Sequence, residues 1–136
     1  MGRDGELDDA DYRALADFRH AIRRFLAFSE TWAAEMGLTP QQHQALLAIR
    51  AAPVGQATVG LVAERLILKP HSATGLVDRL VALGLVVREP AADDRRRACL
   101  RLTPRAYEIL DALSAIHREE IQRMRPVLSQ LLDQIA

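Results

Sequence analysis

A change of period within residues 70–103 constrains the fold of this chain more than any other feature of its sequence. Apolar side chains first recur at helical spacing over residues 73–83 and stop at Gly84, a residue typical of the position that follows a helix. Two short stretches, 86–89 and 100–103, then alternate with the period of two that marks β-strands. Strands this short do not stand alone. The segment therefore predicts a helix and a β-hairpin packed against further helices.

Composition supports a mostly α-helical domain. The 136-residue chain is 49% hydrophobic but only 4% aromatic, so aliphatic side chains fill its core, which favours packed helices. The length suits one domain with its own core. Cys99 is the only cysteine and forms no internal disulfide. Because the sequence has neither a signal-peptide pattern nor a spanning apolar run, we expect a cytoplasmic protein without a membrane partner.

Capping residues mark two helices that precede this segment. Thr39 is an N-cap, Pro40 takes the first helical position, and Gln42 completes a capping box. Thr58 caps a short third helix directly before the helix of residues 70–83. Two short helices in this order are typical of a helix-turn-helix, in which the second, here called the reader helix, contacts DNA.

Long amphipathic helices are predicted at both ends of the chain. The first begins near Asp9 or Asp11 and has an apolar stripe that only Ser29 interrupts: Leu15, Phe18, Ile22, Phe25 and Trp32. The last is capped by Thr103 and carries the stripe Leu110, Leu113, His117, Ile121, Met124, Leu128, Leu131 and Ile135, with Pro126 kinking or splitting it. We expect both stripes to form a dimer interface; packing within one chain is the alternative.

Charge is unevenly distributed although the formal net charge is zero. Residues 57–105 contain nine basic and five acidic side chains, a net charge of +4. The flanking segments, 1–56 and 106–136, each have a net charge of −2. A basic centre between acidic flanks is what a local DNA-binding face needs, although four excess charges also fit an ordinary solvated surface.

The outward face of the reader helix suits a DNA groove. This face is small, polar and cationic, and comprises His71, Gly75, Asp78, Arg79 and Ala82. Nothing bulky obstructs insertion into a major groove about 12 Å wide. The positions able to meet base edges or phosphates are Lys69, His71, Ser72, Thr74, Gly75 and Arg79, with Lys69 either a phosphate contact or an idle surface lysine.

The tip of the hairpin concentrates the charge in the run Asp93, Asp94, Arg95, Arg96 and Arg97. A guanidinium suits the narrow, electronegative minor groove of A·T-rich DNA. We rank Arg96 above every side chain of the reader helix for DNA binding, and expect Arg95 and Arg97 to touch phosphates. A solvated charged turn is the alternative.

Three motifs in this order resemble the MarR family of bacterial transcription regulators: LTPQQHQALLAIR, SATGLVDRLVALGLVVRE and DDRRRACLRLT. The most specific is the wing signature, which falls on Asp94, Arg96, Leu102 and Thr103. The resemblance covers residues 38–103 and implies a winged helix-turn-helix flanked by long N- and C-terminal dimerisation helices. One departure is Ala106, where the family often has glycine.

The resemblance implies a homodimer on a pseudo-palindromic operator in double-stranded DNA. Two reader helices would enter successive major grooves while the wing arginines reach the flanking minor grooves, with Asp94 holding Arg96 in position. Most members of the family are repressors released by a small anionic or phenolic ligand, or by cysteine oxidation. The implied organisation is residues 1–36 for tail and dimerisation helix, 37–105 for DNA binding, and 106–136 for C-terminal dimerisation.

Candidates for an effector site are His20, Arg24, His43 and His117, which could line a pocket of the kind in which family ligands usually lie; each could equally be an ordinary, partly buried side chain. Their spacing fits no metal motif, so neither a metal nor a cofactor is predicted. Cys99 lies in the second strand, unlike the N-terminal-helix cysteine of the family's peroxide sensors, and a structural role is expected.

The sequence thus predicts a DNA-binding transcription regulator, expected to be a repressor that a phenolic or anionic effector releases. A winged-helix module that binds protein and has no operator of its own is the alternative. An enzyme is not expected, because the sequence contains no nucleophile with an adjacent base, no paired carboxylates in an apolar context and no phosphate-binding loop.

Overall fold

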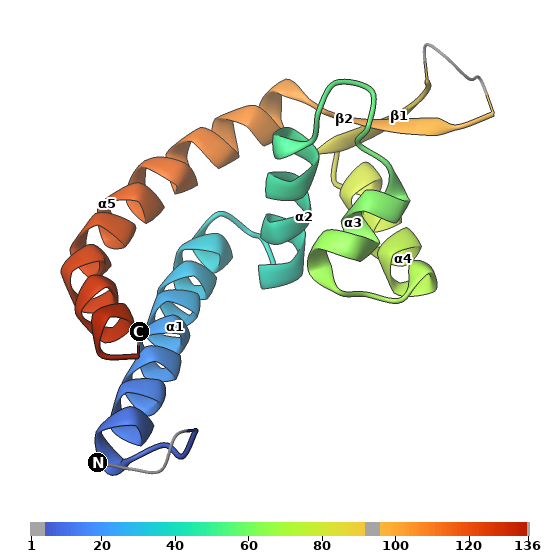
Figure 1. Ribbon diagram of the computed structural model, residues 1–136. Coiled ribbons are helices and arrows are strands. Elements are labelled where there is room, and N and C mark those ends of the chain that lie inside the picture. The colour runs from blue at the N-terminus through green and yellow to red at the C-terminus, as the bar shows by residue number, and fades with distance from the viewer. Residues whose placement is uncertain (1–4, 92–95, 136) are drawn as a thin grey trace. The chain divides into compact units, whose positions relative to one another are not determined.

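Helices dominate the structure, a computed structural model that describes residues 5–91 and 96–135. Within these ranges the elements are α1 (Asp9–Glu35), α2 (Pro40–Ala51), α3 (Val59–Leu66), α4 (Pro70–Ala82), β1 (Val86–Pro90), β2 (Ala98–Leu102) and α5 (Pro104–Ile135) (Figure 1). The predicted class, mostly α with a small β-hairpin, is confirmed. Pro126 does not split the last helix, since α5 continues through it. Across the described ranges no helix is apolar over a length sufficient to cross a membrane.

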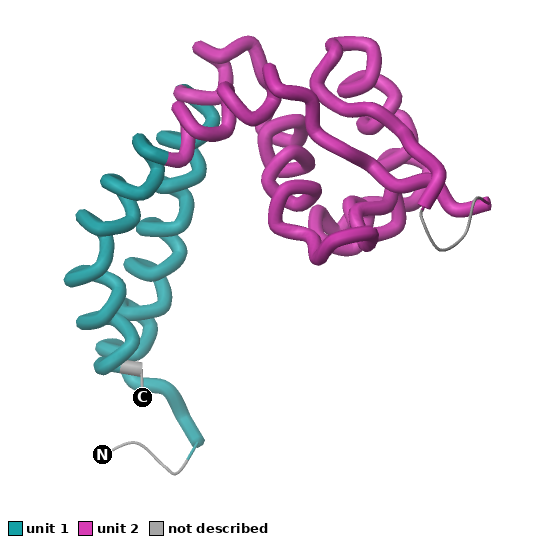
Figure 2. Tube along the Cα trace, turned by 90° about the horizontal axis from the view of Figure 1, so that it is seen from above, with its two compact units in different colours: residues 1–31, 115–136 teal, residues 32–114 magenta. Residues whose placement is uncertain are grey.

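The chain divides into two compact units, shown in different colours in Figure 2. The smaller unit combines residues 1–31 with residues 115–136, and the larger one comprises residues 32–114. The larger unit has an aliphatic core, as the composition predicts. Its largest fully buried side chains are Leu46, Leu80, Leu110, Leu113, Val62, Val77 and Val86. These come from α2, α3, α4, β1 and α5, so one core holds the reader helix and the hairpin together.

Capping hydrogen bonds fix the helix starts of the larger unit. The Thr39 hydroxyl accepts from the Gln42 backbone N–H at 3.1 Å, and the Gln42 side chain accepts from the Thr39 N–H at 3.0 Å, which confirms the predicted capping box. The Thr58 hydroxyl accepts from the Leu61 N–H. The Thr103 hydroxyl accepts from the Ala106 N–H and donates to the Gly84 carbonyl at 2.7 Å. Thr103 therefore joins the start of α5 to the end of the reader helix.

The hairpin pairs β1 and β2 antiparallel, with Val86 opposite Leu102 and Arg88 opposite Leu100. Val86, Leu100 and Leu102 are buried, so one face of the hairpin packs on the core. The Leu100 N–H also donates to the Ala57 carbonyl at 2.7 Å, which ties β2 to the loop between α2 and α3. The hairpin is thereby fixed on the helices, as two short strands require.

The end of the reader helix differs from the prediction at Leu83. The apolar period places it on the buried face, but 45% of it is exposed. The reason is that α4 ends at Ala82 and the chain turns at Leu83 and Gly84. Leu85, which follows the turn, is buried and occupies the core in its place.

The smaller unit is a pair of helices, the N-terminal part of α1 and the C-terminal part of α5, which lie side by side (Figures 1 and 2). Ser29 and His117 are both buried between them and share a hydrogen bond of 2.8 Å between Oγ and Nε2. The rings of Phe25 and Phe28 meet the His117 ring edge to face, with centroids 5.9 and 5.8 Å away. The interruption at Ser29 in the apolar stripe is thus a buried polar contact.

Replacing Ser29 with alanine is expected to lower the free energy of unfolding by about 1–2 kcal/mol, because a buried ring nitrogen loses this hydrogen bond while it stays away from water. Thr31→Ala is the matched control. Its hydroxyl bonds to the Ala27 carbonyl on the exposed side of the same helix, so the loss should stay within about 0.5 kcal/mol. Urea unfolding followed by circular dichroism measures both, and equal losses would contradict the assignment.

Candidate nucleic-acid interface

The reader helix α4 has one buried side and one exposed side. Ala73, Leu76, Val77 and Leu80 are buried in the core of the larger unit. The predicted contact residues lie on the other side, where His71, Ser72, Thr74 and Arg79 are exposed and Gly75 is half-buried. Burial of the inner face holds the helix rigidly, so the structure brings these polar side chains together on one accessible surface.

The N-terminus of α4 is suited to an anion. Lys69 is the N-cap residue, and its side chain makes no capping hydrogen bond. Pro70 at the first position fixes the backbone, and His71 is exposed beside it. The first backbone N–H groups of a helix carry partial positive charge and attract phosphate, and the Lys69 ammonium adds a full charge. This end of the helix can therefore hold a backbone phosphate of DNA.

Thr74 has a restricted hydrogen-bonding capacity. Its hydroxyl donates to the Pro70 carbonyl one turn earlier, at 3.0 Å. The oxygen is left as an acceptor, so toward DNA it matches the amino group of adenine or cytosine. Ser72 is exposed two residues earlier, and its hydroxyl is not restricted in this way. The two hydroxyls thus differ in what they can read.

Asp78, on the outward face of α4, forms an ion pair with Arg88 of β1 at 2.5 Å. The sequence placed Asp78 outward but did not identify this partner, which lies ten residues away on another element. Partly exposed pairs of this kind contribute little to stability, typically less than about 1 kcal/mol. The pair has two consequences. It neutralises a carboxylate that would repel phosphates, and it joins the reader helix to strand β1 of the hairpin.

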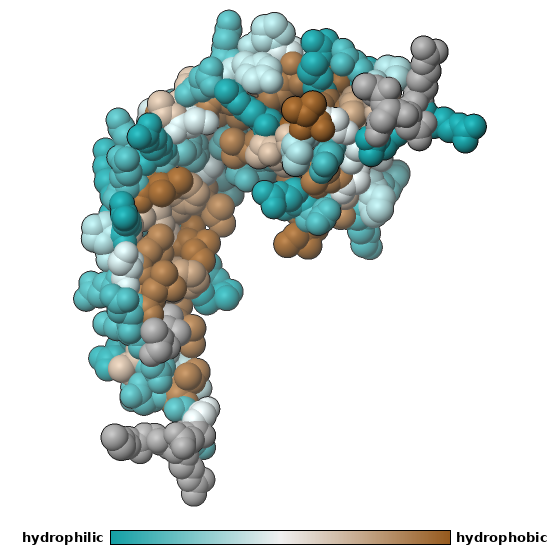
Figure 3. Space-filling view, turned by 45° about the horizontal axis from the view of Figure 1, so that its top comes forward, coloured by the Kyte–Doolittle hydropathy of each residue, from teal (hydrophilic) through white to brown (hydrophobic). Residues whose placement is uncertain are grey.

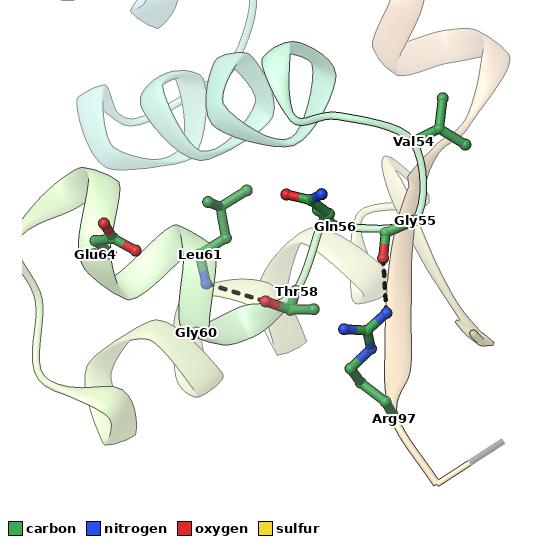
Figure 4. A pocket seen from close by; sticks show the side chains of 8 residues that line it. All are labelled: Val54, Gly55, Gln56, Thr58, Gly60, Leu61, Glu64 and Arg97. Atoms are coloured by element: carbon green, nitrogen blue, oxygen red, sulfur yellow. Dashed lines mark hydrogen bonds between the residues drawn. The ribbon is translucent and has the colours of Figure 1, made fainter. Parts of the chain in front are cut away.

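The hairpin arginines fall into different environments. Arg96 is exposed in the turn directly before β2. The Arg97 guanidinium donates to the Gly55 carbonyl at 3.1 Å, across the hollow lined by Thr58, Gly60 and Glu64 (Figure 4). The predicted site residues Asp94 and Arg95 lie outside the described residues. The contact of Arg97 with the loop before α3 holds the start of β2 near the helices, a role that the sequence did not suggest.

Cys99 contacts the same loop. It is half-buried, and its thiol donates to the Gly55 carbonyl at 3.2 Å. Arg97 and Cys99 therefore share one acceptor, and both hold β2 to residues 54–57. This contact gives Cys99 a packing role in the hairpin.

The four candidate effector residues are not all together. His20 and Arg24 line one hollow of about 310 Å³ in the smaller unit, together with Asp17, Gln130 and Gln134. His117 is buried in the same unit against Ser29. His43 is buried in the larger unit. Among the residues that the structure describes, no group of three or more His, Cys, Asp or Glu is arranged to hold a metal ion.

Comparison with known proteins finds a family match over part of the chain and a shared fold over most of it. Residues 36–97 match the family model described as MarR family. No curated protein matches the chain. Solved structures share its fold: a mutant of MepR from S. aureus, bound to an oligodeoxyribonucleotide, has a TM-score of 0.69 at 20% identity over 96% of this chain and 100% of that one.

Two further solved structures are as similar. AbsC, a MarR family transcriptional regulator from Streptomyces coelicolor, has a TM-score of 0.73 at 20% identity over 90% of this chain and 83% of that one. CouR from Rhodococcus jostii, bound to p-coumaroyl-CoA, has a TM-score of 0.69 at 23% identity over 86% and 85%. The family model thus matches the helix-turn-helix and the first strand of the hairpin, and the fold of these solved structures is shared along most of the chain.

Proposed function

We propose that this protein is a homodimeric repressor that binds a pseudo-palindromic operator in double-stranded DNA and is released by a small phenolic or anionic effector. The observation that carries the proposal is the reader helix α4, whose apolar side is buried in the core while its small polar side is exposed beside a basic hairpin. In this proposal residues 37–105 bind DNA, whereas residues 1–36 and 106–136 form the dimer.

Exposed apolar side chains support the homodimer. Hydrophobic residues form a band along the helices of the smaller unit (Figure 3). The large apolar side chains exposed on these helices include Leu15, Ile22, Leu26, Ile121 and Leu132. Monomeric proteins rarely leave a contiguous patch of this kind in water. A second copy of the same chain would cover it and bring two reader helices onto one DNA duplex.

DNA binding is testable through its salt dependence. The purified protein should bind DNA from the promoter next to its own gene, with an affinity that falls steeply as salt rises, because phosphate contacts release counterions. Lys69→Ala should weaken binding about equally on operator and unrelated DNA and reduce the slope of log affinity against log salt by about 1.

Fluorescence anisotropy over a series of salt concentrations measures both quantities. Arg123→Ala is the matched control, since Arg123 is an exposed cation of α5 that pairs with Glu119 and Glu120 on its own helix. Absence of binding at low salt would contradict DNA recognition and favour the alternative of a protein-interaction module.

Release by an effector is testable at His20 and Arg24. Both line the same hollow of the smaller unit, and their side chains offer cationic and hydrogen-bonding groups to a carboxylate or phenolate. A thermal-shift screen with salicylate, hydroxycinnamates and p-coumaroyl-CoA should identify a compound that raises the melting temperature and weakens DNA binding. Arg24→Ala should abolish both effects, and a response unchanged by this substitution would place the effector elsewhere.

A further inference from the structure

Three helix ends in the larger unit share the same backbone motif. In each, a residue with positive φ follows the helix, and the N–H of the next residue, always leucine, bonds to the carbonyl five residues earlier. The residues with positive φ are Gly37 after α1, Ile67 after α3 and Gly84 after α4, with φ of 78°, 55° and 73°. The bonds run from Leu38 to Ala33, from Leu68 to Ala63 and from Leu85 to Leu80, at 2.9 to 3.0 Å.

Ile67 is the exception among these three. The left-handed conformation favours glycine and tolerates asparagine, whereas in a β-branched residue it crowds the side chain against the backbone. Among the described residues with positive φ, Ile67 alone is not glycine. The motif explains the backbone conformation, because it turns the chain between α3 and α4. It does not explain why isoleucine stands at this position.

Packing does not explain isoleucine either. Leu66 and Leu68, on both sides of it, pack against the core of the larger unit. Ile67 points away from that core and is 92% exposed. The left-handed backbone at a β-branched residue costs stability, and a side chain that stays in water gains nothing from burial to offset that cost. A non-glycine residue that stands in this conformation without being required by the motif or by packing points to a role outside the fold.

The position of Ile67 indicates which function. It lies in the turn between the two helices of the helix-turn-helix, two residues before Lys69 and three before Pro70, where α4 begins. Exposed charges stand on both sides of it, Glu64 and Arg65 before it and Lys69 after it, with a net positive charge. A protein surface of this charge faces the sugar–phosphate backbone of DNA, in which the deoxyribose carbons are the apolar part.

We propose that Ile67 is a DNA-contacting residue whose side chain packs against deoxyribose carbons of the backbone beside the N-terminus of α4. The inference rests on the proposed DNA binding and adds a contact to it. Because sugars carry no sequence information, the contact strengthens binding to operator and unrelated DNA alike. Because isoleucine is uncharged, it does so without releasing counterions.

Three substitutions at this position test the proposal. Ile67→Gly and Ile67→Asn remove the apolar side chain and fit the left-handed backbone, so the melting temperature should stay unchanged or rise. Affinity for operator and for unrelated DNA should fall about five- to tenfold, with an unchanged salt slope. Ile67→Leu keeps an apolar side chain and should retain most of the affinity. Val54→Ala, at a fully exposed valine at the opposite end of α3, is the control and should bind like the wild type.

Anisotropy titrations and thermal unfolding of the full chain provide these readouts. If the wild type binds DNA and the glycine and asparagine variants bind equally well, the contact is refuted while DNA binding stands. If either variant melts at a lower temperature, Ile67 serves the fold and the inference is overturned. If the wild type binds no DNA, the proposed function itself fails, which is a separate result.

Discussion

Replacing Arg96 with alanine is expected to weaken operator binding by about 1–3 kcal/mol, roughly 5- to 150-fold, without changing the oligomeric state. Arg96 is exposed in the turn before β2, at the end of a hairpin fixed on the core through Val86, Leu100 and Leu102. The fixed strands present the arginine to DNA, and its planar guanidinium suits a narrow, electronegative minor groove. Anisotropy titration on the operator measures the effect, and sedimentation velocity checks the dimer.

Two further variants separate charge from shape. Arg96→Lys keeps the positive charge but loses the planar fork, so it should recover only part of the affinity if Arg96 reads a groove, and nearly all of it if Arg96 only touches phosphates. Arg123→Ala removes an exposed arginine from α5 and should leave affinity unchanged. Operator affinity at the wild-type level in Arg96→Ala would remove the hairpin tip from the mechanism.

Much of the fold could be predicted because its signals are local. The capping box of Thr39 and Gln42 lies within four residues, and the hydrogen bonds of the structure reproduce it. The change of period after Gly84 locates the hairpin for the same reason, since it depends only on which side chains alternate along the chain. The exposure of Leu83 could not be predicted in this way, because the apolar period continues one residue past the end of α4, into the turn.

The contacts that complete the candidate interface could not be predicted, because they join residues distant in sequence. The Arg97 guanidinium and the Gly55 carbonyl are 42 residues apart, and Ser29 and His117 are 88 apart. Their side chains carry no pattern that names a partner. The conformation of Ile67 could not be predicted for a different reason. An isoleucine suggests a buried position, and only the structure shows a left-handed backbone with an exposed side chain.

The reader helix and the other contacts contribute differently to the proposed DNA binding. The reader helix offers small polar groups, and of its two exposed hydroxyls that of Thr74 already donates to its own helix. Direct base reading is therefore limited, and affinity must depend on Lys69, the hairpin arginines and the second copy of the chain. Loss of the second copy should accordingly harm operator binding more than loss of any one contact.

Replacing Ile22 and Leu26 together with glutamate is expected to convert the dimer into a folded monomer that binds the operator poorly. These side chains lie one turn apart on α1 and are 40% and 47% exposed, so the chain alone tolerates the change. In a dimer the substitution would bury four unpaired charges and lose the burial of four apolar side chains, which should raise the dimer dissociation constant at least about a thousandfold.

Sedimentation velocity with circular dichroism distinguishes a folded monomer from an unfolded chain. Removing residues 1–30 outright is a poorer test, because it also takes away Ser29 and Phe25, which pack against His117 of α5. Val54→Glu is the matched control, since it places the same charge at an exposed apolar residue of the larger unit and should leave the dimer intact. A stable dimer in the double variant would mean that this face of α1 is not the interface, and the two reader helices would then have to be brought together by another surface.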